Sequence, residues 1–171
     1  MKRDHANTPH SKAVKPVSPA PAARKTILLV DDEYSVREML GRVLVSENYS
    51  VMPAENGDEA LRLAAGAHVD LVLLDLNMPV RGGWDTFERL TTNNPLLPVI
   101  IVTARPNQLF TAAAAGAGAL LEKPLDFPHL LTTIRDLLAE SAEARLARVA
   151  GRAAAFHYQP AQPAGPRENT T

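Results

Sequence analysis

Short apolar runs alternate with segments of helical periodicity through the middle of the chain. The runs are rich in Leu, Val and Ile and are bounded by turn residues, which is typical of strands buried on both faces of a parallel sheet. They are Thr26 to Val30, Leu71 to Pro79, Pro98 to Val102 and Ala119 to Glu122. A fifth run, Tyr49 to Ala54, contains Pro53, which cannot donate to a neighbouring strand and therefore favours an edge of the sheet.

The segments between these runs predict helices. Apolar residues recur at helical spacing from Val36 to Leu44, and Ser35 to Glu38 has the pattern of a capping box at the start of that helix. Asn56 to Glu59 marks a second helix start, with acidic residues in the first turn. Further helices are expected over Trp84 to Thr92, over Gln108 to Ala117 and from Phe127 onward. Right-handed crossovers then give an α/β fold, a doubly wound five-stranded parallel sheet of order 2-1-3-4-5 with helices on both faces.

Both ends of the chain lack this periodicity. Residues 1–25 form a basic, proline-rich tail that we expect to be disordered, and residues 153–171 form a second disordered tail. Residues 26–140 make one domain. Residues 141–152 extend the apolar pattern of the last helix, either as a frayed end or as an extension that binds a partner. The sequence leaves those two alternatives open.

Composition narrows the class of protein. The chain has 171 residues, of which 46% are hydrophobic, enough for one core with tails. It has no cysteine, which excludes disulfides and thiolate metal sites, and no apolar segment near the ~18 residues of a membrane span. We therefore expect a soluble, cytoplasmic protein. The first 25 residues carry six Lys or Arg against one Asp, which fits a solvated linker better than a nucleic-acid-binding arm.

The expected strand ends carry acidic, hydroxyl and amine side chains. The first strand is followed by Asp31-Asp32-Glu33, the second apolar run contains Asp75, the next strand is followed by Thr103, and the last by Lys123. The carboxyl ends of parallel strands share one edge of the sheet, where ligands bind in such folds. Two carboxylates ~5 Å apart repel by roughly 3 kcal/mol at an effective dielectric near 20, so this group of acids favours a bound cation. Oxygen ligands with open positions for water and phosphate select Mg²⁺.

In these motifs the chain resembles the receiver domain of bacterial response regulators, over Thr26 to about Glu140. The resemblance implies a flavodoxin-like fold in which Asp75 is the phosphoacceptor. It also implies a Mg²⁺ site made by Asp31, Asp32, Asp75 and Asn77. Asp32 and the backbone carbonyl of Asn77 would then bind the metal directly, and Asp31 would act through water.

The resemblance also assigns roles to the last two strand ends. Lys123 would pair with the phosphoryl oxygens, and the Lys123-Pro124 peptide bond would be cis, as it is in the family. The Thr103 hydroxyl would swing toward the phosphoryl group. Leu120 stands where most receivers have an aromatic residue, so we expect it to act as passive packing while the loop after Thr103 responds to phosphorylation.

The family implies a signalling function rather than a classical enzyme. We expect a stand-alone response regulator that catalyses its own phosphorylation and dephosphorylation. It would accept phosphate from a histidine kinase or histidine phosphotransfer protein, and act on an unidentified downstream protein. A phosphate shuttle or sink within a phosphorelay is the alternative output. We expect no direct DNA binding and no membrane contact, and a weak homodimer stays open.

Three other readings fit the pattern less well. A phosphatase of the haloacid dehalogenase type also uses a strand-end aspartate, but it needs an acid two residues later, where this chain has Asn77. A flavodoxin-like nucleotide binder needs a glycine- or hydroxyl-rich loop after the first strand, where this chain has three acids. A scaffold that signals by binding alone would not need the complete set of acids, threonine and lysine.

Overall fold

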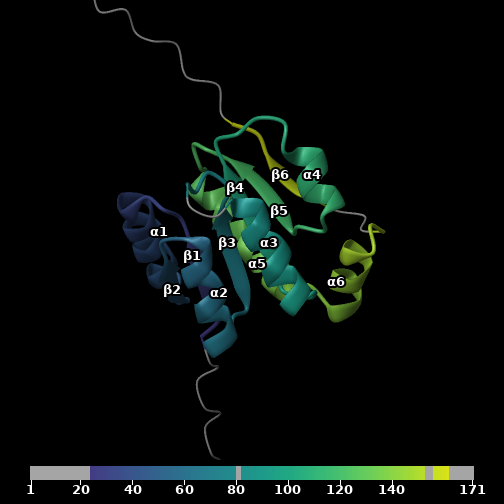
Figure 1. Cartoon of the computed structure of the whole chain (residues 1–171), viewed down its shortest axis with the longest axis horizontal. Coiled ribbons are helices and arrows are strands. Elements are labelled where there is room, and N and C mark those ends of the chain that lie inside the picture. Colours follow the sequence, from purple (N-terminus) through teal and green to yellow (C-terminus); the bar gives the residue numbers. More distant parts are fainter. Residues whose placement is uncertain (1–23, 80–81, 153–155, 162–171) are drawn as a thin grey trace, which may run out of the picture.

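The computed structural model describes residues 24–79, 82–152 and 156–161, and these residues form an α/β fold around one parallel sheet (Figure 1). The sheet has six strands in the order β2-β1-β3-β4-β5-β6, all paired in parallel. The strands are β1 (Thr26–Val30), β2 (Ser50–Ala54), β3 (Leu71–Asp75), β4 (Val99–Thr103), β5 (Ala119–Glu122) and β6 (His157–Gln159). The predicted order of the first five strands is confirmed, with Pro53 in the edge strand β2.

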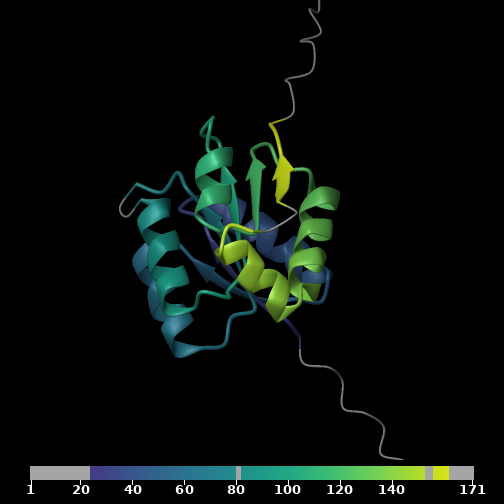
Figure 2. The ribbon, with the colours of Figure 1, turned by 90° about the vertical axis from the view of Figure 1, so that its right-hand side faces the viewer.

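Helices cover both faces of the sheet (Figure 2). They are α1 (Tyr34–Ser46), α2 (Gly57–Gly66), α3 (Gly83–Asn93), α4 (Leu109–Ala114), α5 (Phe127–Ala139) and α6 (Ala142–Val149). Successive strand residues point to opposite faces, so Leu28 packs with α2, α3 and α4 while Leu29 packs with α1 and α5. Leu120 is fully buried in the first of these two clusters, as a packing role requires.

The helix start predicted from the sequence is observed at α2 but not at α1. At α2 the Asn56 side chain accepts the N–H of Glu59, and the Glu59 carboxylate accepts the N–H of Glu55, so the expected start is confirmed. The capping box predicted at Ser35 is wrong. Glu33 is the N-cap of α1 and makes no side-chain cap bond, because its carboxylate instead accepts the Ser35 hydroxyl at 2.6 Å.

The C-terminal segment departs from the expected extension of the last helix. Instead of continuing, α5 ends at Ala139, Glu140 is extended, and α6 begins anew with Ser141 as its N-cap. The buried Arg148 guanidinium donates to the Gly116 carbonyl at 2.8 Å and to Glu140 at 2.7 Å. Residues 141–152 therefore contain a separate helix that is fastened to the body of the domain.

A sixth strand corrects the prediction of a five-stranded sheet, and it corrects the expected disorder of the C-terminal tail where the structure describes it, over residues 156–161. Ala119, Leu120 and Leu121 pair with His157, Tyr158 and Gln159 in turn. A run this short, with no apolar pattern of its own, gives no strand signal in the sequence. The disorder expected for residues 1–23, 153–155 and 162–171 lies outside the described residues. Within the described part of the chain, no helix combines the length and apolarity needed to span a membrane.

Candidate functional site

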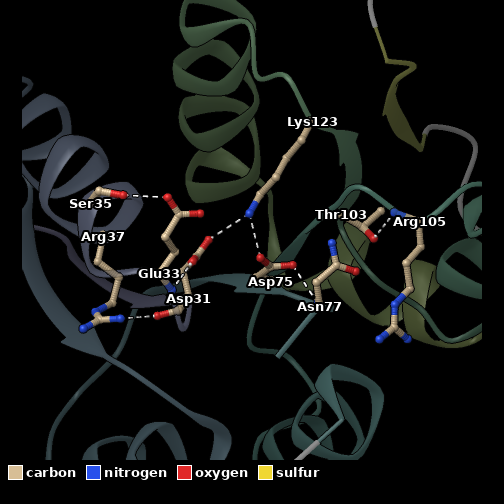
Figure 3. Close-up of polar contacts among 9 residues, drawn as sticks. All are labelled: Asp31, Glu33, Ser35, Arg37, Asp75, Asn77, Thr103, Arg105 and Lys123. Atoms are coloured by element: carbon tan, nitrogen blue, oxygen red, sulfur yellow. Dashed lines mark hydrogen bonds and ion pairs between the residues drawn. The ribbon is translucent and has the colours of Figure 1, made fainter. Parts of the chain in front are cut away.

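Three strand ends meet in a network centred on Lys123 (Figure 3). Its Nζ lies 2.6 Å from Oδ2 of Asp75, the last residue of β3, and 3.0 Å from Oδ2 of Asp31, just after β1. The expected cis bond between Lys123 and Pro124 is present. The sequence prediction that these two acids and the amine share one edge of the sheet is therefore confirmed by the geometry.

Asp75 is held in a fixed position. Its side chain is almost fully buried, Oδ1 accepts the N–H of Asn77 at 2.8 Å, and Oδ2 accepts from Lys123. The first residue of α3, Gly83, packs directly on its backbone, because a Cβ at Gly83 would lie 2.7 Å from the Asp75 carbonyl oxygen. In the sequence, Gly83 indicates only freedom of the loop, so this close approach was not predicted.

Burial and hydrogen bonding act in opposite directions on the pKa values of Asp31 and Lys123. Burial raises the pKa of the Asp31 carboxyl, and hydrogen bonds from the N–H of Glu33 and from Lys123 offset this only in part. Burial alone would lower the pKa of the Lys123 ammonium, but its hydrogen bonds to Asp75 and Asp31 outweigh burial, and the pKa lies above its ordinary value. Lys123 therefore stays protonated at neutral pH.

The acids fit a divalent cation. Carboxylate oxygens of Asp31, Asp32 and Asp75 all lie within 4.8 Å of one another. Asp32 is exposed, and no hydrogen bond of its side chain is seen among the described residues. Asn77 Oδ1 is buried without a hydrogen-bond partner in the same part of the structure. A set of hard oxygen donors with spare acceptor capacity matches the ligand preference of Mg²⁺.

Thr103 lies at the end of β4 but does not yet face the acids. It is fully buried, and its Oγ1 accepts the N–H of Arg105 at 2.9 Å (Figure 3). Its carbonyl accepts the N–H of Lys123 at 2.8 Å, which ties the ends of β4 and β5 together. No hydrogen bond between Thr103 and Asp75 is found within the described residues, and the Thr103 hydroxyl hydrogen stays available to donate.

Comparison with known proteins identifies the family. The family model of the response regulator receiver domain matches residues 27–135. The chain belongs to this family. Receiver domains are phosphoacceptor signalling domains that receive a phosphoryl group from histidine kinases and bind Mg²⁺ at an acidic pocket.

Curated relatives extend beyond the matched region. The chain is 40% identical over 120 residues to the transcriptional regulatory protein GlrR of Escherichia coli (strain K12), covering 69% of this chain and 27% of GlrR. It is 39% identical over 118 residues to the response regulator MprA of Mycobacterium sp. (strain KMS), covering 68% of this chain and 51% of MprA. The matched region thus spans between about a quarter and half of these relatives.

Solved structures of similar fold include a complex with a phosphate mimic. The response regulator protein TrrA of Thermotoga maritima, in complex with Mg²⁺ and BeF, matches with a TM-score of 0.62 at 32% identity, covering 66% of this chain and 98% of TrrA. The chemotaxis protein CheY4 of Vibrio cholerae matches with a TM-score of 0.63 at 31% identity, covering 67% of this chain and 99% of CheY4.

Proposed function

We propose that Asp75 accepts a phosphoryl group from a histidine kinase or a histidine phosphotransfer protein, and that the phosphorylated chain signals through altered contacts with another protein. The observation that carries this proposal is the Lys123 ammonium held between Asp75 and Asp31. A lysine 2.6 Å from a buried carboxylate, beside two further acids, is suited to receive the charge of a phosphoryl group.

Transfer begins when one carboxylate oxygen of Asp75 attacks the phosphorus of the donor. A P–O bond forms as the P–N bond to the donor imidazole breaks, and the imidazole leaves with the bonding electron pair. The Asn77 N–H fixes the orientation of the Asp75 carboxylate. Lys123 moves its hydrogen bond from Asp75 Oδ2 to the arriving phosphoryl oxygens, and the Thr103 hydroxyl turns from the Arg105 N–H to donate to the same group.

Asp31, Asp32, Asp75 and Asn77 are the residues that would hold Mg²⁺ in this proposal. A bound Mg²⁺ supplies positive charge that offsets the repulsion between phosphoryl oxygens and carboxylates. Asp31 already accepts hydrogen bonds from Glu33 and Lys123, which leaves Asp32 as the more available direct ligand. The similar structure of TrrA in complex with Mg²⁺ and BeF supports a Mg²⁺ site in this chain, without bearing on which residues hold the ion.

Labelling from acetyl phosphate tests the acceptor. With Mg²⁺ present, the full chain should form an acyl phosphate that base and hydroxylamine cleave, and Asp75→Asn should abolish it. The matched control is Asp136→Asn, which changes an exposed acid on α5. Equal labelling of wild type and Asp75→Asn would overturn the proposal, whereas loss in both variants would indicate a folding defect to be checked by circular dichroism.

Two modes of output, a phosphate shuttle or sink and a regulator that acts by protein contact, differ in what happens to the phosphoryl group. If the chain is a phosphate shuttle or sink, phosphorylated chain mixed with a histidine phosphotransfer protein should pass the label back to its histidine. A regulator that acts by protein contact should keep the label until it is hydrolysed. The absence of direct DNA binding stays a prediction, because one relative is named a transcriptional regulatory protein.

A further inference from the structure

The strand β6 covers the edge of β5 that would otherwise be open. Two hydrogen bonds to Glu122 hold β6 and the residues that follow it. β6 has three residues and pairs in parallel with Ala119 to Leu121 (Figure 1). Just beyond this pairing, the Tyr158 hydroxyl donates to Glu122 Oε1 at 3.1 Å, and the N–H of Ala161 donates to Glu122 Oε2 at 2.9 Å. Glu122 therefore fastens both β6 and the residues that follow it.

Glu122 is joined through the backbone to the acceptor site. It directly precedes Lys123, whose ammonium holds Asp75 and Asp31, and it pairs with Thr103 across β4 and β5. Lys123 and Thr103 are the two residues that must rearrange when a phosphoryl group arrives on Asp75. Glu122, which anchors β6, is therefore one peptide bond from Lys123 and one backbone pairing from Thr103.

Gln159, the last residue of β6, weakens the pairing of β6 with β5. Gln159 is buried, and neither its Oε1 nor its Nε2 has a hydrogen-bond partner within the described residues. Burying an unpaired amide weakens an association by roughly tenfold or more, because its hydrogen bonds to water are lost without replacement. The buried, unpaired amide of Gln159 therefore weakens the docking of this three-residue strand.

The helix before β6 is held independently of it. Arg148 in α6 bonds to Gly116 and Glu140, and Arg145 donates to the carbonyl of Leu137 at 3.2 Å, all of them outside β6. Since none of these contacts involves Glu122, β6 can leave the edge of β5 while α6 stays in place. The covalent link to α6 then keeps β6 close enough to return.

We propose that β6 is a displaceable strand whose docking stabilises the unphosphorylated arrangement of Lys123 and Thr103, so that phosphorylation releases it. This inference rests on the proposed function of Asp75. Release exposes the N–H and C=O groups of β5, which an extended segment of a partner protein can pair with as an added strand. Linkage requires the converse: weaker docking of β6 must tighten phosphoryl binding, and stronger docking must weaken it.

Two substitutions in the full chain move docking in opposite directions. Tyr158→Phe removes one bond to Glu122 and should speed hydrogen exchange over residues 156–161 by about three- to tenfold. Gln159→Met replaces the unpaired amide with an apolar side chain of similar length and should slow that exchange. Tyr49→Phe is the control, because it removes a hydroxyl from the residue just before β2 at the far edge of the sheet.

The affinity for beryllofluoride with Mg²⁺, measured by titration calorimetry, tests the link to the site. We expect at least roughly twofold tighter binding in Tyr158→Phe, weaker binding in Gln159→Met and no change in Tyr49→Phe. Beryllofluoride should also speed exchange over residues 156–161 in the wild type. Equal affinities despite opposite changes in exchange would overturn the inference. Failure of beryllofluoride to bind the wild type would instead count against the proposed function.

Discussion

A single glycine sets how closely α3 approaches the acceptor aspartate. A Cβ on Gly83 would lie 2.4 Å from Leu76 Cα and 2.7 Å from the Asp75 carbonyl oxygen, so alanine forces backbone to move. We expect Gly83→Ala to lower the free energy of unfolding by about 1 to 3 kcal/mol, since overpacking against backbone has no flexible side chain to absorb it. It should also slow labelling of Asp75 by acetyl phosphate, because the acceptor shifts.

The neighbouring glycine supplies the control for this substitution. Among the described residues, no atom beyond the chain neighbours would lie within 4 Å of a Cβ added to Gly82, and the φ of -53° at this residue suits alanine. Gly82→Ala should change the free energy of unfolding by no more than about 0.5 kcal/mol in urea titrations. Similar effects of the two substitutions would show that close packing at Gly83 is not what matters.

The two acids after β1 should contribute unequally to Mg²⁺ binding. Asp31 is engaged by Glu33 and Lys123, whereas Asp32 is exposed and has no hydrogen bond among the described side chains. We expect Asp32→Asn to weaken Mg²⁺ binding by more than Asp31→Asn, as measured by titration calorimetry. Asp136→Asn should have no effect. An equal loss in both variants would remove the distinction between a direct ligand and one that acts through water.

The positions of individual residues were predictable from the sequence where they depend only on the ends of parallel strands. Asp31, Asp75 and Lys123 meet because parallel strands end at one edge. The close approach of Gly83 and the hydrogen bond between Ser35 and Glu33 depend on distances between a helix and its neighbours, which residue spacing does not determine. For the same reason the capping box at Ser35 was a reasonable prediction that failed.

At the level of elements, an ion pair joins the starts of β1 and β3. Asp70 accepts from Lys25 Nζ and from the N–H of Thr26, both at 2.8 Å. Burial would raise the pKa of Asp70, but these hydrogen bonds outweigh burial and hold the pKa below its ordinary value. The resulting stabilisation is therefore complete above the pKa of the unfolded chain and is lost as the pH falls through the lower pKa of the folded chain.

Asp70→Asn should thus destabilise the protein in a pH-dependent way. We expect a loss of about 1 to 2 kcal/mol in the free energy of unfolding at pH 7, since two hydrogen bonds lose their charged acceptor. The difference from wild type should shrink as the pH falls below about 4. Urea titrations across that range measure it, with Asp136→Asn for comparison. A difference that stays constant with pH would mean that the charge of Asp70 is not involved.

The attachment of α6 makes a second prediction at this scale. Replacing the buried Arg148 with Met removes the donor to the Gly116 carbonyl and the nearer of the two arginines that pair with the Glu140 carboxylate. We expect amide exchange over residues 142–149 to accelerate by about tenfold or more, because a charge-assisted pair is worth about 1.5 to 3 kcal/mol. Exchange in β1 and β3 should not change. Arg152→Ala, at an exposed position beyond α6, is the control.

Helices and strands with a clear apolar periodicity were predictable from the sequence. The short C-terminal elements α6 and β6 were not. The four buried strands and the main helices have apolar patterns of their own, so their positions agree with the sequence to within a few residues. The separate helix α6 had a signal in Ser141, an N-cap residue whose side chain accepts the N–H of Ala144 at 3.1 Å. β6 forms because it can pair with the open edge of β5, and such a tertiary contact has no signal in the local sequence.

For the whole molecule, the sequence determined the layers and the order of the first five strands, because crossovers between parallel strands have one hand. It did not determine where the chain goes after α5. The contacts of Arg145 and Arg148 bring α6 against the segments that lead into β4 and β5, at Leu96 and Gly116. From there β6 runs back along the sheet toward the acids.

The direction of β6 has a practical consequence for attaching probes. α5 runs antiparallel to the strands and ends at the edge opposite Asp75, so a label placed at Ala139 would begin far from the chemistry. The return along β6 reverses this, because the N–H of Ala161 bonds to Glu122, the residue before Lys123. A fluorophore or donor group joined at Ala161 therefore starts beside the end of the sheet that carries Asp75, and suits distance measurements to a protein bound there.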